Sequence, residues 1–541
     1  MTTRRQFVKA MAALPPALAL SQSLAATPEA SRLALVIGNA NYRTTPLRNP
    51  VNDAQAMGKL LEQAGFRIQS HLNAGRDEMI GAIRRFGAAA NRPETRLAVF
   101  YYAGHGAQLD WRNYLLPIDA VVEKQEHIKQ RCVDLGLLLG ELVAGQAKSF
   151  VILLDACRDD PFGLGYQPDR KGLSQFDAPV GSLLAYATAP GRAAADGEGA
   201  HGLYTEHLLR EFAVHNVRIE DALKRVRLNV RLQSQGEQIP WETTSLESDI
   251  MLFGTRPQKL ADTEMEQLLE REIEYWNRIK NSVVIDEWVT YLRDYPNGRF
   301  AEIAQARLNR LLVANRMSKT AAVPKSPSQE PTHPAIELAP GHPASQVLAS
   351  SANPYSSGYF PLGRRYSVGD EATIRESDLL TGVEVRIFTQ RVTRVDVVAD
   401  RVEINDGAGI WDLMGNPIKV GDREYDVPLQ LYPAELQVGK TWTAAFKLTA
   451  RGRSSNAYYD LRIAAREKVR VPAGEFDAFR IDGLGWNNTV GYQLEIHLWV
   501  MPGLIVPVRR DWIVRGRHQG RYKETQRHEL VSLHQQATAL D

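Results

Sequence analysis

The stretch Leu97–Gly106, LAVFYYAGHG, decides how the amino-terminal part of this chain folds. Six consecutive apolar residues lead into a loop in which two glycines flank His105. A second apolar run, Ser149–Leu154, leads in the same way into Asp155, Ala156 and Cys157. Short apolar runs that end in turn residues are typical of strands buried on both faces of a parallel sheet. Both segments therefore predict a buried strand that ends in a loop with a chemically reactive side chain.

Outward from these two strands, apolar runs alternate with amphipathic helical patterns. Further strands are expected at Leu33–Ile37, Phe66–His71 and Leu183–Tyr186, and helices at Asn52–Ala64, Glu78–Ala89, Leu203–Phe212 and Glu220–Leu232. Such alternation predicts an α/β domain over residues 32–255, with a mainly parallel sheet covered by helices on both faces.

The rest of the chain changes character twice. Residues 262–315 have helical periodicity with a turn at Tyr295–Gly298, which predicts a helical hairpin. Residues 316–355 are rich in Pro, Ser and Ala, which predicts a disordered linker. From residue 359 to 537 the hydrophobic period drops to two, which predicts an antiparallel β domain. Within it, Arg509 and Arg510 are expected on a solvated strand face.

The first 26 residues resemble an export signal. Paired arginines in RRQFVK are followed by an apolar stretch from Ala10 to Leu20 and by small residues at 23–26. This pattern predicts a twin-arginine signal peptide and a periplasmic or otherwise exported protein; a general secretory signal or an uncleaved anchor are the alternatives. We expect no transmembrane span after signal removal, since no other stretch is long and apolar enough.

Composition excludes several classes of protein. The formal net charge is only +2, which argues against a nucleic-acid partner. The two cysteines, Cys132 and Cys157, are too few for a disulfide framework or a thiolate zinc site. We expect no metal ligands, and Cys132 is interpreted as structural, although a disulfide with Cys157 would silence that thiol.

His105 and Cys157 are the candidate catalytic pair. Ligands bind outside the carboxyl ends of parallel strands, so both side chains are expected at one edge of the sheet. A thiolate is a strong nucleophile, and a neighbouring imidazole can accept and return its proton. The backbone amides of Gly106 and Cys157 can donate to the oxyanion of a tetrahedral intermediate. Taken singly, each residue has an ordinary structural explanation, but the pair at this spacing favours catalysis.

Six segments, in order, resemble the caspase-fold peptidases, in particular their prokaryotic metacaspase-like branch in peptidase family C14. They are LVIGNANY (35–42), NPVNDA (49–54), YYAGHG (101–106), ILLDACR (152–158), YATAPG (186–191) and GLYT (202–205). The resemblance covers about two fifths of the chain and implies a caspase-like fold with a catalytic dyad of His105 and Cys157.

The resemblance also implies cleavage after Arg or Lys, with Asp155 and Asp53 at the positions of acids that bind the substrate side chain. For Asp53, a structural role at a helix amino terminus is an equal alternative. The resemblance implies no required cofactor and leaves calcium activation open, but Asp159, Asp160 and Asp169 have no dedicated calcium spacing. Arg170-Lys171 is a candidate self-cleavage site.

Three functions remain open at this stage. The first is an active cysteine endopeptidase, acting on peptide or protein substrates through a thioester acyl-enzyme. The second is a catalytically idle caspase-fold protein that binds or regulates partners in the cell envelope. The third is an envelope carrier whose β domain binds a ligand.

Overall fold

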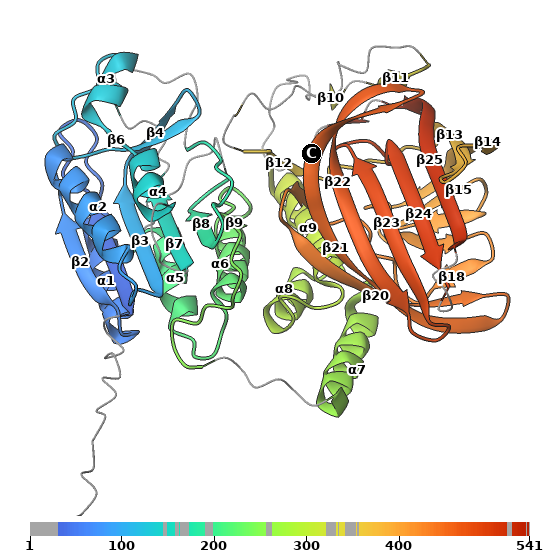
Figure 1. Ribbon diagram of the computed structural model, residues 1–541, viewed down its shortest axis with the longest axis horizontal. Helices are drawn as coiled ribbons and strands as arrows, with labels where there is room; N and C mark the ends of the chain where they lie inside the picture. The colour runs from blue at the N-terminus through green and yellow to red at the C-terminus, as the bar shows by residue number, and fades with distance from the viewer. Residues whose placement is uncertain are drawn as a thin grey trace, which may run out of the picture.

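The structure is a computed structural model of the 541-residue chain. It describes residues 31–143, 149–156, 162, 173–189, 199–255, 262–320, 332–333, 335–340, 353, 356–516, 522–536 and 538–539. The amino-terminal α/β domain lies beside the carboxy-terminal β domain, and a group of helices links the two (Figure 1).

The α/β domain is built on a six-stranded sheet. In spatial order its strands are β2 (Arg67–Leu72), β1 (Arg32–Gly38), β3 (Leu97–Gly104), β7 (Ser149–Ala156), β8 (Ser182–Tyr186) and β9 (Trp241–Thr244). All neighbours pair in parallel except β9, which is antiparallel to β8. Every residue of β3 and β7 is buried, because helices cover both faces of the sheet.

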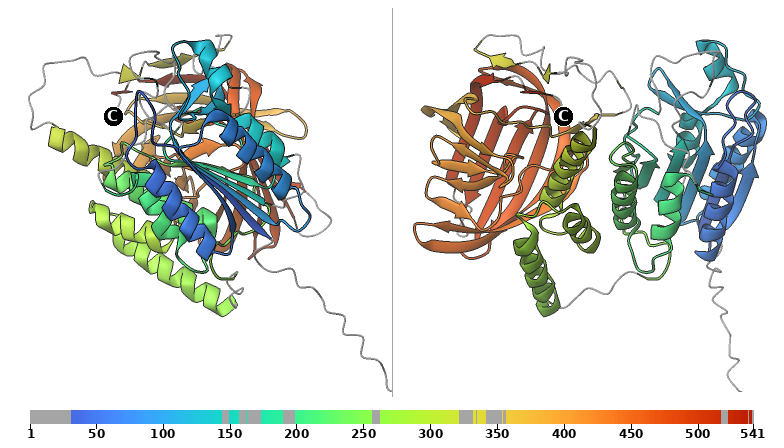
Figure 2. Two further views of the ribbon diagram at one scale, coloured as in Figure 1. Left: turned by 90° about the vertical axis from the view of Figure 1, so that its left-hand side faces the viewer. Right: turned by 180° about the vertical axis from the view of Figure 1, so that it is seen from behind.

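Helices pack in two groups around this sheet, as Figure 2 shows. In the first group α1 contacts α5 and α5 contacts α6, whereas in the second group α2 contacts α4. Their bounds are α1 (Pro50–Gln63), α2 (Arg76–Ala90), α4 (Leu135–Val143), α5 (Leu203–Phe212) and α6 (Ile219–Gln233). This arrangement confirms the predicted mainly parallel sheet with helices on both faces.

A small antiparallel sheet follows β3, and the sequence analysis does not anticipate it. It consists of β4 (Gly106–Leu109), β5 (Arg112–Leu115) and β6 (Val133–Asp134), with α3 (Gln125–Arg131) between the last two. The strands are only two to four residues long, so their alternation is too short to recognise.

The linking helices differ from the predicted hairpin. Over residues 262–320 the structure has α7 (Asp262–Ile279), α8 (Ile285–Asp294) and α9 (Ala301–Thr320). The first predicted helix is divided at Ser282, whose hydroxyl accepts the Val284 N–H and whose carbonyl accepts the Trp288 indole N–H. These bonds replace the helical pattern of the backbone at that point.

The prediction of a disordered linker over residues 316–355 is wrong for parts of that segment. Helix α9 continues to Thr320, and two short strands follow, β10 (Thr332–His333) and β11 (Ile336–Leu338). β10 pairs with β26 (Thr538–Ala539), and β11 pairs with β25 (Tyr522–Gln535). Leu338 is buried in the β domain core, which gives this otherwise polar segment an anchor.

The carboxy-terminal domain is antiparallel, as predicted. Strands β13 to β18 and β20 to β25 form a closed ring, because β24 also pairs with β25, and β11 adds to its edge. The bounds are β12 (Tyr359–Pro361), β13 (Glu371–Asp378), β14 (Glu384–Asp396), β15 (Arg401–Ile404), β16 (Gly409–Trp411), β17 (Pro417–Val420), β18 (Arg423–Tyr425), β19 (Glu435–Gln437), β20 (Thr441–Ala450), β21 (Arg453–Val471), β22 (Gly474–Asn487), β23 (Tyr492–Val500), β24 (Arg509–Arg515), β25 (Tyr522–Gln535) and β26 (Thr538–Ala539).

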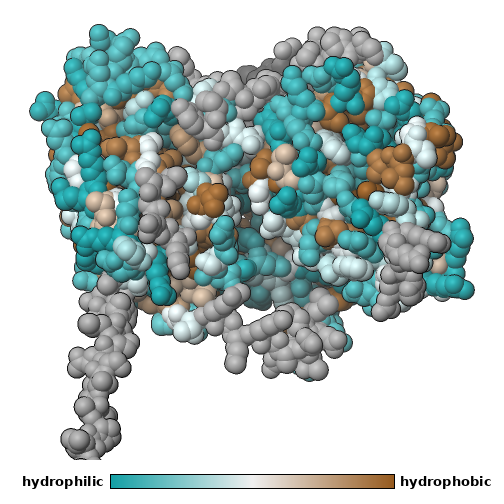
Figure 3. Space-filling view, viewed as in Figure 1, coloured by the Kyte–Doolittle hydropathy of each residue, from teal (hydrophilic) through white to brown (hydrophobic). Residues whose placement is uncertain are grey.

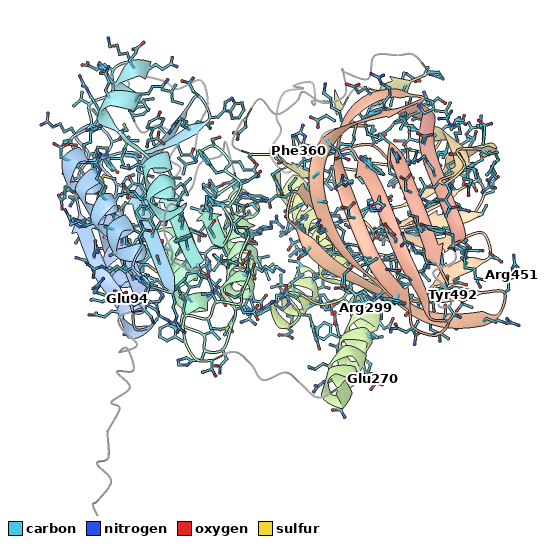
Figure 4. All side chains as sticks on the ribbon, in the orientation of Figure 1. Glu94, Glu270, Arg299, Phe360, Arg451 and Tyr492 are labelled. Carbon is cyan, nitrogen blue, oxygen red and sulfur yellow. The ribbon has the colours of Figure 1, made fainter. Side chains whose placement is uncertain are left out.

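Charged side chains join the parts of the molecule. Arg227 of α6 forms ion pairs with Glu242 of its own domain (2.6 Å) and Glu435 of the β domain (2.9 Å). Arg299, labelled in Figure 4, donates to the backbone carbonyl of Ala445 at 2.6 Å.

The visible surface is mostly hydrophilic with scattered hydrophobic patches (Figure 3). No helix among the described residues is long and apolar enough to cross a membrane.

Candidate active site

The candidate site lies where β3 and β7 end side by side. The two strands run parallel in register from Leu97 opposite Ser149 to Gly104 opposite Ala156. His105 and Cys157 are the next residues of the two strands in the sequence. Cys157 itself lies outside the described residues, and the structure describes the strand before it, β7, up to Ala156. A Cβ added at Gly106 would lie 3.2 Å from the Cβ of Ala156, which shows how closely the two strand ends approach.

Gly104 is required for the turn that presents His105. Its φ of +155° lies in a region that residues with side chains rarely adopt. A Cβ there would also lie 2.6 Å from the Tyr42 hydroxyl and 2.7 Å from the Tyr102 hydroxyl. Any larger residue would therefore displace the loop that carries His105.

One backbone contact sets the tautomer of His105. The imidazole is buried, and its Nε2 lies 2.7 Å from the carbonyl oxygen of Thr45. A carbonyl oxygen can only accept, so Nε2 must carry the hydrogen in this bond. In the neutral ring Nδ1 is then the basic nitrogen, which is the atom that can take up a proton.

Two tyrosines hold the loop from behind. The Tyr42 hydroxyl accepts the N–H of His105 at 3.0 Å, and its ring lies 4.5 Å from the imidazole, centroid to centroid. The Tyr102 hydroxyl lies within hydrogen-bond distance of the carbonyl oxygens of His105 (2.7 Å) and Leu116 (3.0 Å). Burial, followed by the influence of Tyr42, raises the pKa of Tyr102 well above its usual value, so Tyr102 stays a neutral donor. The imidazole is thus held by packing as well as by hydrogen bonds.

The Gly106 amide is oriented by the β4–β5 ladder. Leu116 donates its N–H to the carbonyl oxygen of His105 at 3.0 Å, as at a hydrogen-bonded position of the ladder, whereas the His105 N–H goes to the Tyr42 hydroxyl. Antiparallel pairs alternate, so the next pair, Gly106 and Leu115, is of the non-hydrogen-bonded type. The N–H of Gly106 consequently points away from β5.

Asp155 is buried at the end of β7, beside Thr205 of α5. The Thr205 hydroxyl donates to Oδ2 of Asp155 at 2.7 Å and lies 2.6 Å from the Tyr101 hydroxyl. Burial raises the pKa of Tyr101 well above its usual value, and the charges of Asp155 and Asp53 add to the effect. The Thr205 hydroxyl thus links Asp155 to Tyr101, and Asp155 stands at the same edge of the sheet as His105.

Asp53 is fully buried in the first turn of α1. Its Oδ1 lies 2.8 Å from Nδ1 of His201, and the Gly202 N–H donates to the carboxylate at 3.2 Å. These contacts cross to the segment that precedes α5. Asp53 thus combines the helix-terminal position expected for a structural acid with contacts to the start of the segment whose Thr205 binds Asp155.

Cys132 lies in the core cluster behind the His105 loop, together with Tyr42, Tyr114 and Ile128. Burial raises the pKa of its thiol to about 12, so the thiol is protonated and unreactive near neutral pH. This environment agrees with its interpretation as a structural residue.

Several predicted features fall outside the described residues. They are the signal segment 1–26, the acids Asp159, Asp160 and Asp169, and the pair Arg170-Lys171. Within the ranges that the structure describes, no three His, Cys, Asp or Glu residues form a group that could hold a metal ion.

The sequence analysis does not single out Thr45, Thr205 or His201. Thr45 acts through its backbone carbonyl, which no sequence pattern reveals. Thr205 is the last residue of GLYT (202–205), one of the segments that carry the family resemblance, and that position is a signal by which it could have been chosen as a candidate site residue. The contact between His201 and Asp53 joins residues that are far apart in the chain.

Comparison with known proteins agrees with this architecture. Residues 31–251 match the family model of the caspase domain, peptidase C14. This part of the chain is therefore a caspase-like domain of the C14 cysteine-peptidase class. A 128-residue segment is 31% identical to mucosa-associated lymphoid tissue lymphoma translocation protein 1 of Homo sapiens. The homologous protein of Mus musculus is 30% identical over the same length.

In both cases the match covers 24% of this chain and only 15% of the relative. Among solved structures, the initiator caspase Dronc of Drosophila matches with 14% identity and a TM-score of 0.30. That match covers 42% of this chain and 84% of the Dronc chain.

Proposed function

We propose that the chain is a cysteine endopeptidase that cleaves after Arg or Lys, with His105 and Cys157 as its catalytic dyad. One observation carries this proposal: β3 and β7 are paired in register up to Gly104 and Ala156, the residues immediately before His105 and Cys157. Neighbouring parallel strands lie about 4.8 Å apart, so the two side chains begin within reach of one another.

The described residues support a consistent sequence of steps. Nδ1 of His105 accepts the thiol proton of Cys157, while Thr45 holds the ring through Nε2. The thiolate attacks the scissile carbonyl, and the amides of Gly106 and Cys157 donate to the resulting oxyanion. The imidazolium then gives its proton to the leaving amine as the C–N bond breaks, and the acyl group remains on Cys157 as a thioester. His105 deprotonates a water molecule that attacks the thioester, the C–S bond breaks, the acyl group leaves as a carboxylic acid, and the imidazolium reprotonates the Cys157 thiolate.

The preference for a basic residue rests on Asp155 and Asp53. Both carboxylates are buried, and Asp155 stands at the end of β7, two residues before Cys157. A substrate guanidinium or ammonium group is the natural charge partner for such acids. A cationic side chain would also offset the repulsion between two buried acids and a nearby thiolate.

The test is hydrolysis of fluorogenic peptides that end in Arg, Lys or Asp, with and without calcium. We expect cleavage after Arg and Lys that is lost in Cys157→Ala and in His105→Ala. Cleavage after Asp would keep the dyad and refute the assigned acidic pocket. No cleavage under either condition, by protein with a native circular dichroism spectrum, would favour the catalytically idle binding protein instead. The comparison with and without calcium also decides whether calcium activates the enzyme.

Export is a separate part of the proposal. The RRQFVK motif supports passage through the twin-arginine route to the periplasm. Replacement of Arg4 and Arg5 by lysine should leave the protein in the cytoplasmic fraction, whereas the unaltered chain should be found outside the inner membrane.

A further inference from the structure

The β domain contains a cavity that the proposed peptidase mechanism does not use. It has a volume of about 70 Å³ and lies among strands β13 to β17, β24 and β25. Apolar side chains such as Val392, Trp411 and Leu530 form much of its wall. Two arginines, Arg364 and Arg510, share this lining. Charged groups in an apolar cavity need partners, because burial without them is costly.

Arg364 is almost completely buried, with 9% of its surface exposed. Its Nε and Nη1 donate to the backbone carbonyls of Leu504 and Met414, both at 2.9 Å. The guanidinium lies 3.9 Å from the centre of the Tyr432 ring, which also lines the cavity. Nη2 is buried and makes no hydrogen bond to any residue that the structure describes. The Nη2 group of Arg364 therefore has N–H donors that no described residue accepts.

Arg510 approaches the same tyrosine from β24. Burial lowers its pKa, and Tyr432 is the first of the groups that act against this effect. Its Nη2 lies 2.8 Å from Nδ1 of His528, and a guanidinium can only donate, so the imidazole is a neutral acceptor. Burial and Arg510 lower the pKa of His528 to about 2, in agreement with the neutral ring. The expectation of a solvated strand face is therefore only partly right for Arg510, because this arginine is half-buried and lines the cavity.

The carboxylates around the cavity do not neutralise these two arginines. Glu529 is paired with Arg375 and Glu376 with Arg386, each at 2.8 Å. Asp412 accepts hydrogen bonds from the backbone amides of Met414 and Asn416. Among the described residues, no acidic oxygen lies within ion-pair distance of Arg364 or Arg510. The cavity therefore has two cations in its lining, one of them with an unused buried donor, while the acid of the lining, Glu529, is already paired with Arg375.

We propose that this cavity binds a small organic anion, a carboxylate or phosphate group with a short apolar substituent, through Arg364 and Arg510. A planar guanidinium matches the two oxygens of such a group. The apolar wall accepts the substituent, and the volume excludes long chains. This site is independent of the peptidase reaction, so failure of one proposal leaves the other standing.

Calorimetric titration of the full-length protein tests the proposal directly. The titrants are propionate, its neutral analogue propionamide, and inorganic phosphate. We expect saturable binding of propionate or phosphate, whichever matches the natural headgroup, and none of propionamide. Equal binding of propionate and propionamide would overturn the proposal, as would the absence of binding by both anions.

Substitutions then locate the site. Arg364→Met and Arg510→Met should each raise the dissociation constant about tenfold or more, as loss of one charge-assisted hydrogen bond implies. Arg509→Met is the matched control, since this arginine is the neighbour of Arg510 on β24 but does not line the cavity, and its partner Asp511 keeps a second partner in Arg527, so binding should be unchanged. If only the control variant bound the anion more weakly, or if none of the three variants did, the anion would bind elsewhere on the protein. If a cavity variant fails to fold, the comparison of propionate with propionamide on the unaltered chain still decides.

Discussion

Gly104 and Ala156 are register partners at the carboxyl ends of two buried parallel strands. This single pairing brings the loop with His105 to the place where the chain continues into Cys157. Glycine stands at both sides of His105, since a Cβ at 104 would collide with the hydroxyls of Tyr42 and Tyr102, and one at 106 would crowd Leu173 and Ala156. The predictions that follow test the parts of this arrangement one at a time.

Tyr42→Phe should impair catalysis with little change in the fold. The substitution removes the hydroxyl that accepts the His105 N–H and contacts the Leu116 carbonyl. Loss of these buried bonds should lower the free energy of unfolding by about 1–3 kcal/mol and reduce kcat more than it changes KM. Chemical denaturation and steady-state kinetics measure both quantities.

Tyr204→Phe is the control for this variant. Tyr204 is also buried, but its hydroxyl has no hydrogen-bond partner among the described residues. Its removal should be neutral or stabilising and should leave kcat unchanged. If both variants lost activity equally, the hydroxyl of Tyr42 would have no special part in holding His105.

Asp155→Asn and Asp53→Asn should selectively weaken cleavage after Arg and Lys. Each variant keeps the shape of the side chain and removes one negative charge from the proposed pocket. A charge-assisted contact contributes about 1.5–3 kcal/mol, so kcat/KM should fall by roughly 10- to 100-fold. Asp110→Asn is the control, because Asp110 is exposed and paired with Lys129. Loss of structure in circular dichroism without a specific loss of kcat/KM would assign both acids a structural role.

The two cysteines should differ sharply toward iodoacetamide. In native protein at neutral pH, we expect one alkylated thiol, at Cys157, because burial holds the pKa of Cys132 near 12. Unfolding in denaturant should expose the second thiol. Mass spectrometry of tryptic peptides identifies each site, and rapid labelling of Cys132 in the native protein would contradict its burial.

His528 should make the β domain sensitive to acid. Its pKa is lowered to about 2 in the folded state by burial, Arg510 and Arg386, against 6.5 for the free group. Between pH 6.5 and pH 2, His528 is therefore protonated in the unfolded chain but stays neutral in the folded chain. The free energy of unfolding consequently falls as the pH drops from 6.5 toward 2. His528→Gln should make this decline less steep in denaturant titrations at several pH values. An unchanged slope would show that other groups control acid unfolding.

The sequence predicts the α/β domain well because its signals are local. Apolar runs such as Leu97–Tyr102 and amphipathic helices can be recognised from contiguous residues alone. The loops that follow the strands then indicate the edge of the sheet where His105 lies. Closure of the β domain depends on pairing between β24 and β25 and between β18 and β20, which no local pattern encodes. The same is true of the contact between Thr45 and His105, which uses a backbone atom. Arg510 has the same sequence signature as its neighbour Arg509, yet only the three-dimensional arrangement shows that Arg510 lines a cavity.

Covalent labelling with a peptidyl acyloxymethyl ketone that ends in Arg tests the central claim most directly. We expect one equivalent of reagent on Cys157, identified by mass spectrometry, no labelling of Cys132, and strongly reduced labelling in His105→Ala. The matched reagent ending in Asp should react far more slowly. Labelling that is absent, that occurs at Cys132, or that proceeds equally well without His105 would contradict a dyad of His105 and Cys157.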